Sequence, residues 1–234
     1  MRRHVSWEGV FPAVTTQFRL DLSLDVEATA RVLDGLIRDG VSGLIVCGTV
    51  GENCSLAKSE KIAVMEAAKA VARGRLPVLC GIAEFTSAFA IDMAKEAARI
   101  GLDGVMVMPA LVYSSKPNET AAHFRSVATA TDLPVMVYNN PPIYKNDVTP
   151  QILASLADCE TIVCFKESSG DTRRFTDLRD MSATASCCSR AWTTSWSRAS
   201  WSARRAGCRD CPTRSRAKAR RCSASPGPGA TTRR

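Results

Sequence analysis

The sequence lacks the features by which membrane, secreted and nucleotide-binding proteins are usually recognised. It has no run of about 18 apolar residues that would cross a membrane. Its basic N-terminus has no apolar stretch of about 7–15 residues that would act as a secretory signal. The glycine fingerprints of dinucleotide- and phosphate-binding loops are also missing. The ten cysteines form no disulfide framework, and the CxxC pair of Cys208 and Cys211 has no second pair beside it. We therefore expect a cytoplasmic protein with reduced cysteines, no membrane segment and no bound metal.

A further absence divides the chain near Asp180. From Met181 to the end there is no Ile, Leu, Val, Phe or Tyr, whereas there are twelve Lys+Arg and a single acid, Asp210. The first 180 residues carry 19 Lys+Arg against 22 Asp+Glu, so the net charge of +8 comes from the tail. A segment without aliphatic side chains cannot bury enough apolar surface to offset its ordering entropy. We predict a folded domain over residues 1–180 and a basic, disordered tail over residues 181–234.

Within the first 180 residues, short apolar runs alternate with amphipathic stretches of helical length. The runs predict strands at Val10–Thr16, Gly43–Cys47, Pro77–Gly81, Gly104–Met108, Val135–Asn139 and Thr161–Lys166. The amphipathic stretches predict helices at Asp25–Asp39, Lys58–Ala72, Ser87–Ile100, Glu119–Ala130, Pro150–Ala157 and Thr172–Asp180. Buried strands that are each followed by a helix indicate a parallel sheet with helical crossovers. The six βα units fit either a doubly wound sheet or an unfinished barrel. The missing glycine fingerprints favour an α/β fold of the (β/α)8 TIM barrel type with a disrupted C-terminal part.

One lysine lies where a barrel enzyme places its chemistry, at the carboxyl end of a strand. Lys166 follows the apolar run Ile162–Phe165. Desolvation there would lower the pKa of the amine, and a neutral amine can attack a ketone to form an iminium. The iminium is an electron sink that permits cleavage of a C–C bond or loss of a leaving group. The alternative is an ordinary lysine that reaches solvent or pairs with Glu167.

Two other strand ends carry possible partners. Tyr138 ends the preceding strand, and its phenol is a plausible proton shuttle for an amine opposite it. Thr49 lies in the turn that begins at Gly48, where a hydroxyl and backbone N–H groups can bind a carboxylate or pass a proton. The alternatives are a packing role for the tyrosine and a turn-stabilising role for the threonine.

Four segments together resemble one enzyme family. They are GVFPAVTTQF, GTVGEN, YNNP and FKESSGD, and their order, spacing and content across about residues 7–180 are similar to the dihydrodipicolinate synthase/N-acetylneuraminate lyase family. The resemblance implies a (β/α)8 barrel, assembled as a homotetramer when complete, that acts on pyruvate or another small 2-oxo acid without a cofactor. It further implies that Lys166 is the Schiff-base lysine, that Tyr138 is the catalytic tyrosine, and that Gly48 and Thr49 begin the loop that binds the substrate carboxylate.

Two substrate-site positions depart from the family pattern. Val50 replaces the second hydroxyl residue of the usual Gly-Thr-Thr-Gly-Glu motif, so the usual proton relay is interrupted or rerouted. Ile143 stands where 4-hydroxy-tetrahydrodipicolinate synthases carry a carboxylate-binding arginine, and an aliphatic side chain cannot make that bidentate contact. The resemblance therefore favours a keto-deoxy sugar-acid aldolase or dehydratase, or a 4-hydroxy-1-pyrroline-2-carboxylate deaminase, with the synthase as the alternative. Tyr113 is a possible counterpart of the tyrosine that neighbouring subunits exchange in some members.

The tail has the character of a coding sequence read in the wrong frame. If each codon takes the last base of one triplet and the first two of the next, Arg190–Trp196 can encode GLDDLV, and Arg205–Arg216 with the first two bases of the Ala217 codon can encode GWVSGLSNAFPR. Both strings resemble the last strands and covering loops of the family. We therefore expect a frameshift near residues 180–183 and no specific nucleic-acid binding by the basic tail. The alternatives are a non-catalytic truncated product and a nucleic-acid binder that uses its tail.

Overall fold

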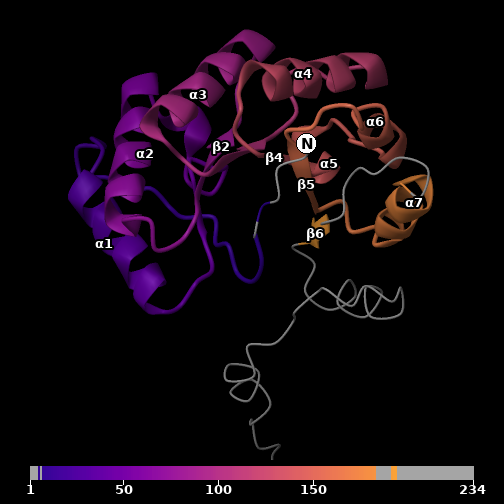
Figure 1. Ribbon diagram of the computed structural model, residues 1–234. Helices are drawn as coiled ribbons and strands as arrows, with labels where there is room; N and C mark the ends of the chain where they lie inside the picture. The colour runs from indigo at the N-terminus through magenta and orange to yellow at the C-terminus, as the bar shows by residue number, and fades with distance from the viewer. Residues whose placement is uncertain (1–4, 6, 183–190, 194–234) are drawn as a thin grey trace, which may run out of the picture.

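Six parallel strands form the centre of the molecule. The computed structural model describes residues 5, 7–182 and 191–193, and Figure 1 shows their arrangement. The strands are hydrogen-bonded in chain order as one sheet, β1 (Leu44–Val46), β2 (Val78–Ile82), β3 (Gly104–Val107), β4 (Val135–Asn139), β5 (Ile162–Glu167) and β6 (Ala191–Thr193). Every neighbouring pair is parallel, as expected when helical crossovers connect consecutive strands.

The helices form an arc around the outside of this sheet (Figure 1). They are α1 (Val26–Arg38), α2 (Lys58–Ala72), α3 (Ser87–Ile100), α4 (Pro117–Ala130), α6 (Pro150–Ala154) and α7 (Arg173–Ser182), with the short η1 (Asn53–Ser55) and α5 (Pro141–Tyr144) in the loops after β1 and β4. Side-chain caps fix several starts: Asp25 accepts from Ala28 N at 2.7 Å, and Thr86 accepts from Phe89 N at 3.2 Å. In the described chain, none of the helices is long and apolar enough to cross a membrane.

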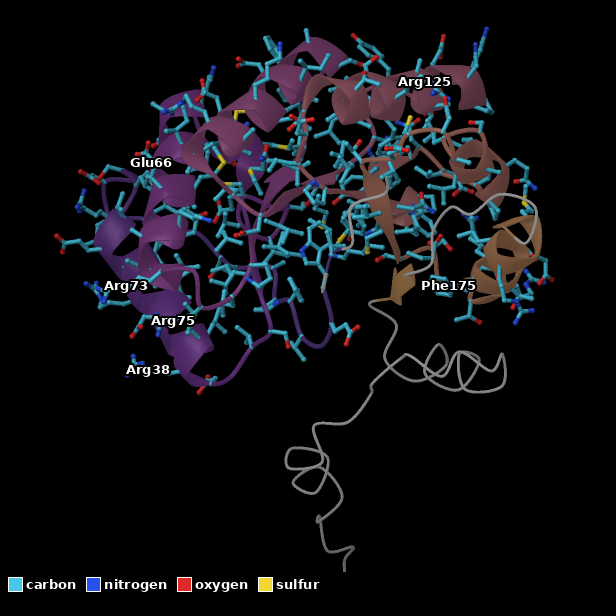
Figure 2. The ribbon with its side chains drawn as sticks, viewed as in Figure 1. Arg38, Glu66, Arg73, Arg75, Arg125 and Phe175 are labelled. Atoms are coloured by element: carbon cyan, nitrogen blue, oxygen red, sulfur yellow. The ribbon has the colours of Figure 1, made fainter. Side chains whose placement is uncertain are left out.

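The sheet has two differently packed faces, because successive strand residues point to opposite sides. One face points into the barrel, and each strand from β1 to β5 contributes a buried residue to it, namely Ile45, Leu79, Met106, Met136 and Cys164. The other face packs against the helices in a larger apolar cluster. Arg125, labelled in Figure 2, braces this helical layer, since its guanidinium donates to Ser155 O at 2.7 Å and pairs with Asp158. The architecture is the predicted TIM barrel, open at the C-terminal part of the chain.

The predicted first strand differs most from the structure. Val10–Thr16 lies in parallel beside β1 but forms only the isolated bridge between Ala13 and Ile45. Ile45 N donates to Pro12 O at 3.0 Å, and Val14 N donates to Ile45 O at 2.9 Å. Pro12 has no N–H to donate, which limits any longer ladder on this segment. The segment nevertheless occupies the place of the first barrel strand.

The last described strand comes from the segment predicted to be a tail. β6 extends the sheet beyond β5, with Lys166 opposite Trp192 in the register. It falls inside Arg190–Trp196, which the shifted frame reads as a family-like strand. The Arg205–Arg216 segment, with Cys208 and Cys211, lies outside the described residues, so the boundary at residue 180 stays a prediction.

Candidate active site

Lys166 and Tyr138 face each other across neighbouring strands inside the barrel. They are direct partners in the β4–β5 register. Each lies two residues beyond an inward-facing core residue, Met136 on β4 and Cys164 on β5, and so shares that face. The Lys166 amine lies 4.1 Å from the centroid of the Tyr138 ring and 3.8 Å from the sulfur of Met106. The structure therefore brings the two predicted residues together.

The surroundings of Lys166 shift its amine toward the neutral form. Burial is the largest influence and lowers the pKa of Lys166 below its ordinary value, while ionisation of Tyr138 or Cys164 would oppose that shift. In the described residues, no carboxylate forms an ion pair with the Lys166 amine. The alternative pairing with Glu167 does not occur, because the next residue on a strand points to the opposite face.

Glu167 instead joins a polar network behind the sheet. Asn139 is fully buried, and its side-chain nitrogen donates to the two Glu167 oxygens at 3.2 and 3.1 Å. The Asn139 oxygen accepts from Val148 N at 2.8 Å, which ties the loop after β4 to the strand end. Arg174 on α7 forms a bidentate ion pair with Asp147, and its guanidinium lies 3.8 Å from a carboxylate oxygen of Glu167. This network holds the ends of β4 and β5 in register, and with them Tyr138 and Lys166.

The turn that carries Thr49 is held by buried contacts to the end of β1 and to β2. Asn53 donates to Cys47 O at 2.9 Å and to Gly81 O at 3.1 Å. Gly48 is buried, and its carbonyl accepts from Gly51 N at 2.9 Å. A side chain at Gly81 would come within 2.6 Å of Cys47 O, so glycine is required for this approach. The turn is thus fixed at the end of β1, on the side of the barrel that Lys166 occupies.

Thr49 itself contacts a residue that the sequence analysis did not select. Its hydroxyl lies 2.5 Å from the phenol oxygen of Tyr144, a residue at the end of α5. The Tyr144 ring packs edge-on against the Tyr138 ring, with centroids 5.6 Å apart. Among the described residues, Thr49 has no direct hydrogen bond to Tyr138. Tyr144 therefore stands between the two predicted hydroxyl residues.

Comparison with known proteins fits this geometry. The sequence profile of the "Dihydrodipicolinate synthetase family" matches residues 6–186. The chain belongs to this family. It is 34% identical over 172 residues to a protein of Sphingopyxis alaskensis named 4-hydroxy-tetrahydrodipicolinate synthase, covering 73% of this chain and 58% of that protein. It is also 34% identical over 167 residues to an uncharacterized DapA-like lyase of Rhizobium meliloti, covering 71% of this chain and 55% of the relative.

Solved structures of the dihydrodipicolinate synthetase family share the fold. YagE, a prophage protein from E. coli K12 crystallised in complex with pyruvate, superposes with a TM-score of 0.72 at 29% identity, over 77% of this chain and 61% of that chain. A Thermotoga maritima dihydrodipicolinate synthase superposes with a TM-score of 0.74 at 26% identity, over 80% and 63%. The chain thus spans about three-fifths of the relatives that it matches. The predicted family and barrel are confirmed.

The two positions that depart from the family pattern lie at the exposed rim of the site. The Val50 side chain is 56% exposed and Ile143 is 61% exposed. Tyr113, in the loop after β3, is 82% exposed, and only its backbone oxygen is bound by Asn146. In the part of the chain that the structure describes, no hydrogen bond or ring contact joins these side chains to Lys166, so their predicted roles toward substrate or a neighbouring subunit rest on the family pattern.

Tyr144 could have been found from the sequence only indirectly. It lies six residues after Tyr138 in YNNPPIY, and the two prolines suggest a tight turn between the tyrosines. That turn is α5, closed by the bond from Tyr144 N to Asn140 O at 2.9 Å. Nothing local in the sequence indicates that the chain bends back toward Thr49.

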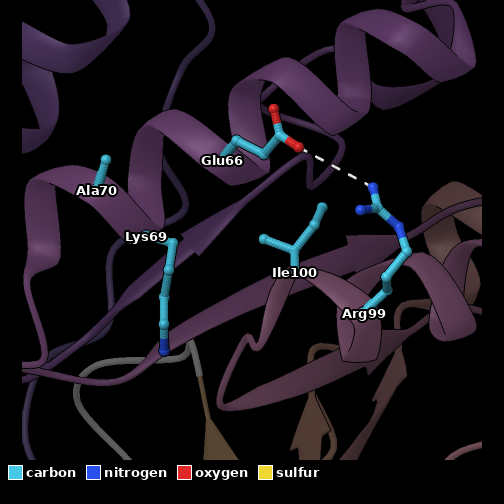
Figure 3. Close-up of a pocket in the computed structure, with 5 residues that line it drawn as sticks. All are labelled: Glu66, Lys69, Ala70, Arg99 and Ile100. Carbon is cyan, nitrogen blue, oxygen red and sulfur yellow. Dashed lines mark ion pairs between the residues drawn. The ribbon is translucent and has the colours of Figure 1, made fainter.

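A shallow depression on the helical surface is unrelated to this site. It measures about 320 Å³ and lies between α2 and α3, where Arg99 points toward Glu66 (Figure 3). Its lining residues are Glu66, Lys69, Ala70, Arg99 and Ile100. The described residues also contain no group of three or more His, Cys, Asp or Glu that could hold a metal ion.

Proposed function

We propose that this chain derives from a Schiff-base-forming lyase that acts on pyruvate or a related 2-oxo acid. The observation that carries the proposal is the partly buried Lys166 amine, 4.1 Å from the Tyr138 ring centroid and without a carboxylate partner in the described chain. Such an amine is available as a nucleophile at a pH where an exposed lysine is protonated. The complex of the family member YagE with pyruvate supports this substrate class.

Lys166, Tyr138 and Thr49 have separate roles in the proposed reaction. Lys166 attacks the ketone carbon, and the carbinolamine loses water to give an iminium. Tyr138 supplies the proton that leaves with that water and then accepts a proton from the substrate. Thr49 and the backbone of the Gly48 turn bind the carboxylate of the 2-oxo acid. The covalent Schiff base takes the place of a cofactor.

The rim of the site bears on the identity of the substrate. Ile143 offers no positive charge to a second carboxylate. This supports aldol cleavage or dehydration of a keto-deoxy sugar acid, or deamination of 4-hydroxy-1-pyrroline-2-carboxylate. The second candidate is 4-hydroxy-tetrahydrodipicolinate synthase, which is favoured by the names of relatives such as that of Sphingopyxis alaskensis. Measuring each of these reactions in turn separates the candidates.

The proposal also covers the location of the enzyme and its assembly. Cys47, Cys54 and Cys80 are free thiols, which supports a reducing, cytoplasmic location. Exposed apolar side chains near the site support association with further copies of the chain in a homo-oligomer, and they include Val50, Phe85, Phe89, Val112, Tyr113 and Ile143. We expect a small-molecule substrate and no specific nucleic-acid partner.

The test is covalent trapping. The 234-residue chain and a frame-corrected counterpart are treated with pyruvate and borohydride, and their intact masses are measured. We expect a single pyruvyl adduct on Lys166, which is lost in Lys166→Arg and kept in Lys95→Arg, a change of an exposed lysine on α3. A folded, frame-corrected chain that forms no adduct would overturn the assignment to pyruvate.

A further inference from the structure

Tyr144 is placed to connect two residues of the proposed site. Its phenol oxygen lies 2.5 Å from the Thr49 hydroxyl, and its ring packs edge-on against Tyr138 at 83° between the planes. Tyr138 in turn lies beneath the Lys166 amine. The order in space is therefore Thr49, Tyr144, Tyr138 and Lys166, although Thr49 and Tyr144 are 95 residues apart in the chain.

The backbone around Tyr144 fixes this position. Asn140 begins α5, and its carbonyl accepts from Tyr144 N at 2.9 Å. Lys145 then ends the helix in the left-handed region at φ 59°, so the chain turns away directly after Tyr144. The Asn140 side chain also donates to the Tyr138 phenol oxygen at 3.1 Å, which leaves that oxygen with a defined orientation.

Tyr144 stays a neutral phenol in this setting. Burial raises its pKa to about 12, and the nearby Tyr138 phenol adds to the rise, while the Thr49 hydroxyl opposes it. A neutral hydroxyl can donate one hydrogen bond while it accepts another. Thr49 lies at the exposed end of the row.

We propose that Tyr144 is a positioning residue that links Tyr138 to the Thr49 hydroxyl and so gives Tyr138 a proton path to solvent. The inference rests on the proposed Schiff-base function. Val50 does not provide the second loop hydroxyl of the family pattern, and Tyr144 offers a hydroxyl from a different loop that contacts Thr49. The path runs from Tyr138 through Tyr144 to Thr49 and water.

The path matters when the iminium becomes an enamine. Loss of water from the carbinolamine takes the Tyr138 proton and leaves a phenolate. The C3–H bond of the pyruvyl iminium then breaks: its electron pair forms the C2–C3 double bond, the C–N double-bond pair returns to nitrogen, and the proton goes to the Tyr138 oxygen. In D2O, deuterium enters C3 only after this proton has exchanged with solvent. Without the path, the same proton returns to carbon.

The experiment measures trapping and exchange separately. The wild type, Tyr144→Phe, Thr49→Val and the double variant are prepared in the 234-residue chain and in its frame-corrected counterpart. NMR follows deuterium incorporation at C3 of pyruvate, and borohydride trapping measures the adduct. Tyr144→Phe keeps the aromatic ring and Lys166, so we expect the final amount of adduct to be undiminished. We expect deuterium exchange to be slowed about tenfold, which is less than the effect typical of groups that transfer the proton themselves. Thr49→Val should slow exchange similarly, and the double variant little more than either.

The outcomes distinguish the inference from the function on which it rests. Wild-type exchange in Tyr144→Phe, or effects that multiply in the double variant, would overturn the role of Tyr144 while adduct formation still supports the lyase. If the wild type forms no adduct, the lyase proposal fails, and the Thr49–Tyr144 link is judged from urea midpoints of the same four proteins. If the two groups are coupled, the double variant shifts the urea midpoint by less than the sum of the two single shifts. Additive shifts would contradict the link.

Discussion

At the scale of single residues, burial sets the reactivity of Lys166. The amine is enclosed by the Tyr138 ring and the Met106 sulfur, and it has no carboxylate partner in the described part of the chain. An ammonium ion in such a place loses hydration that an aromatic face and a thioether replace only in part. The neutral form is therefore favoured at a lower pH than in an exposed lysine.

We therefore predict that the reactivity of Lys166 rises at a lower pH than that of an exposed lysine. Competitive acylation followed by peptide mass spectrometry compares Lys166 with the exposed Lys95. Because burial lowers the pKa of Lys166, its reactivity should reach half of its maximum below pH 10.5, the ordinary lysine value. A half-maximum at or above the ordinary value would show that the amine is hydrated and that its pKa is not lowered.

At the scale of the elements, the pairing of β4 with β5 positions the site. The register shifts between Val135 and Met136, and beyond this irregularity it places Tyr138 opposite Lys166 and Asn139 opposite Glu167. The inward pair carries the proposed chemistry, whereas the outward pair carries the hydrogen bonds that hold the strands. A change in the outward pair should thus disturb the inward pair through the backbone.

Asn139→Ala is predicted to destabilise the fold strongly. The variant removes donors to the buried Glu167 and leaves Val148 N without its acceptor, which costs about 3 kcal/mol for unsatisfied buried groups. Urea unfolding followed by far-UV circular dichroism measures the loss. Asn118→Ala, a change of an exposed asparagine on α4, should alter stability by less than about 0.5 kcal/mol. Equal urea midpoints for the two variants would show that the network of Asn139 and Glu167 does not stabilise the fold.

At the scale of the whole molecule, the described sheet is not closed. Among the described residues, the edge of β1 away from β2 pairs only through the bridge at Ala13, and β6 has no further strand partner. Open strand edges expose unpaired backbone groups and favour aggregation. The family resemblance implies two more βα units, and the shifted frame of the tail encodes segments resembling them.

Restoring the frame near residues 180–183 is predicted to complete the barrel. The frame-corrected chain should be more soluble, unfold at a higher urea concentration and form the pyruvyl adduct, whereas the 234-residue chain should be poorly folded or inactive. Light scattering, urea unfolding and trapping compare the two proteins. Equal solubility and turnover would contradict this prediction, and resequencing that finds an uninterrupted frame would contradict the frameshift itself.

Local sequence patterns predicted most elements of the fold. The bounds of α2, α3 and β4 agree with the structure because the apolar spacing is encoded within each segment, and Thr86 caps the start of α3. The barrel and the placement of Lys166 and Tyr138 followed from the same patterns together with the family motifs. The first strand was predicted too long, because apolar character alone does not reveal that the ladder lacks a donor at Pro12.

The sequence by itself determined where β1 to β5 end to within one residue, since strand ends follow from the length of each apolar run. Only the tertiary structure decided which side chains meet there. The contact of Thr49 with Tyr144 depends on the path of two loops that are far apart in the chain, and the pairing of Asn139 with Glu167 depends on strand register. Register and loop paths are set by packing of the whole barrel, which no single segment of the sequence encodes.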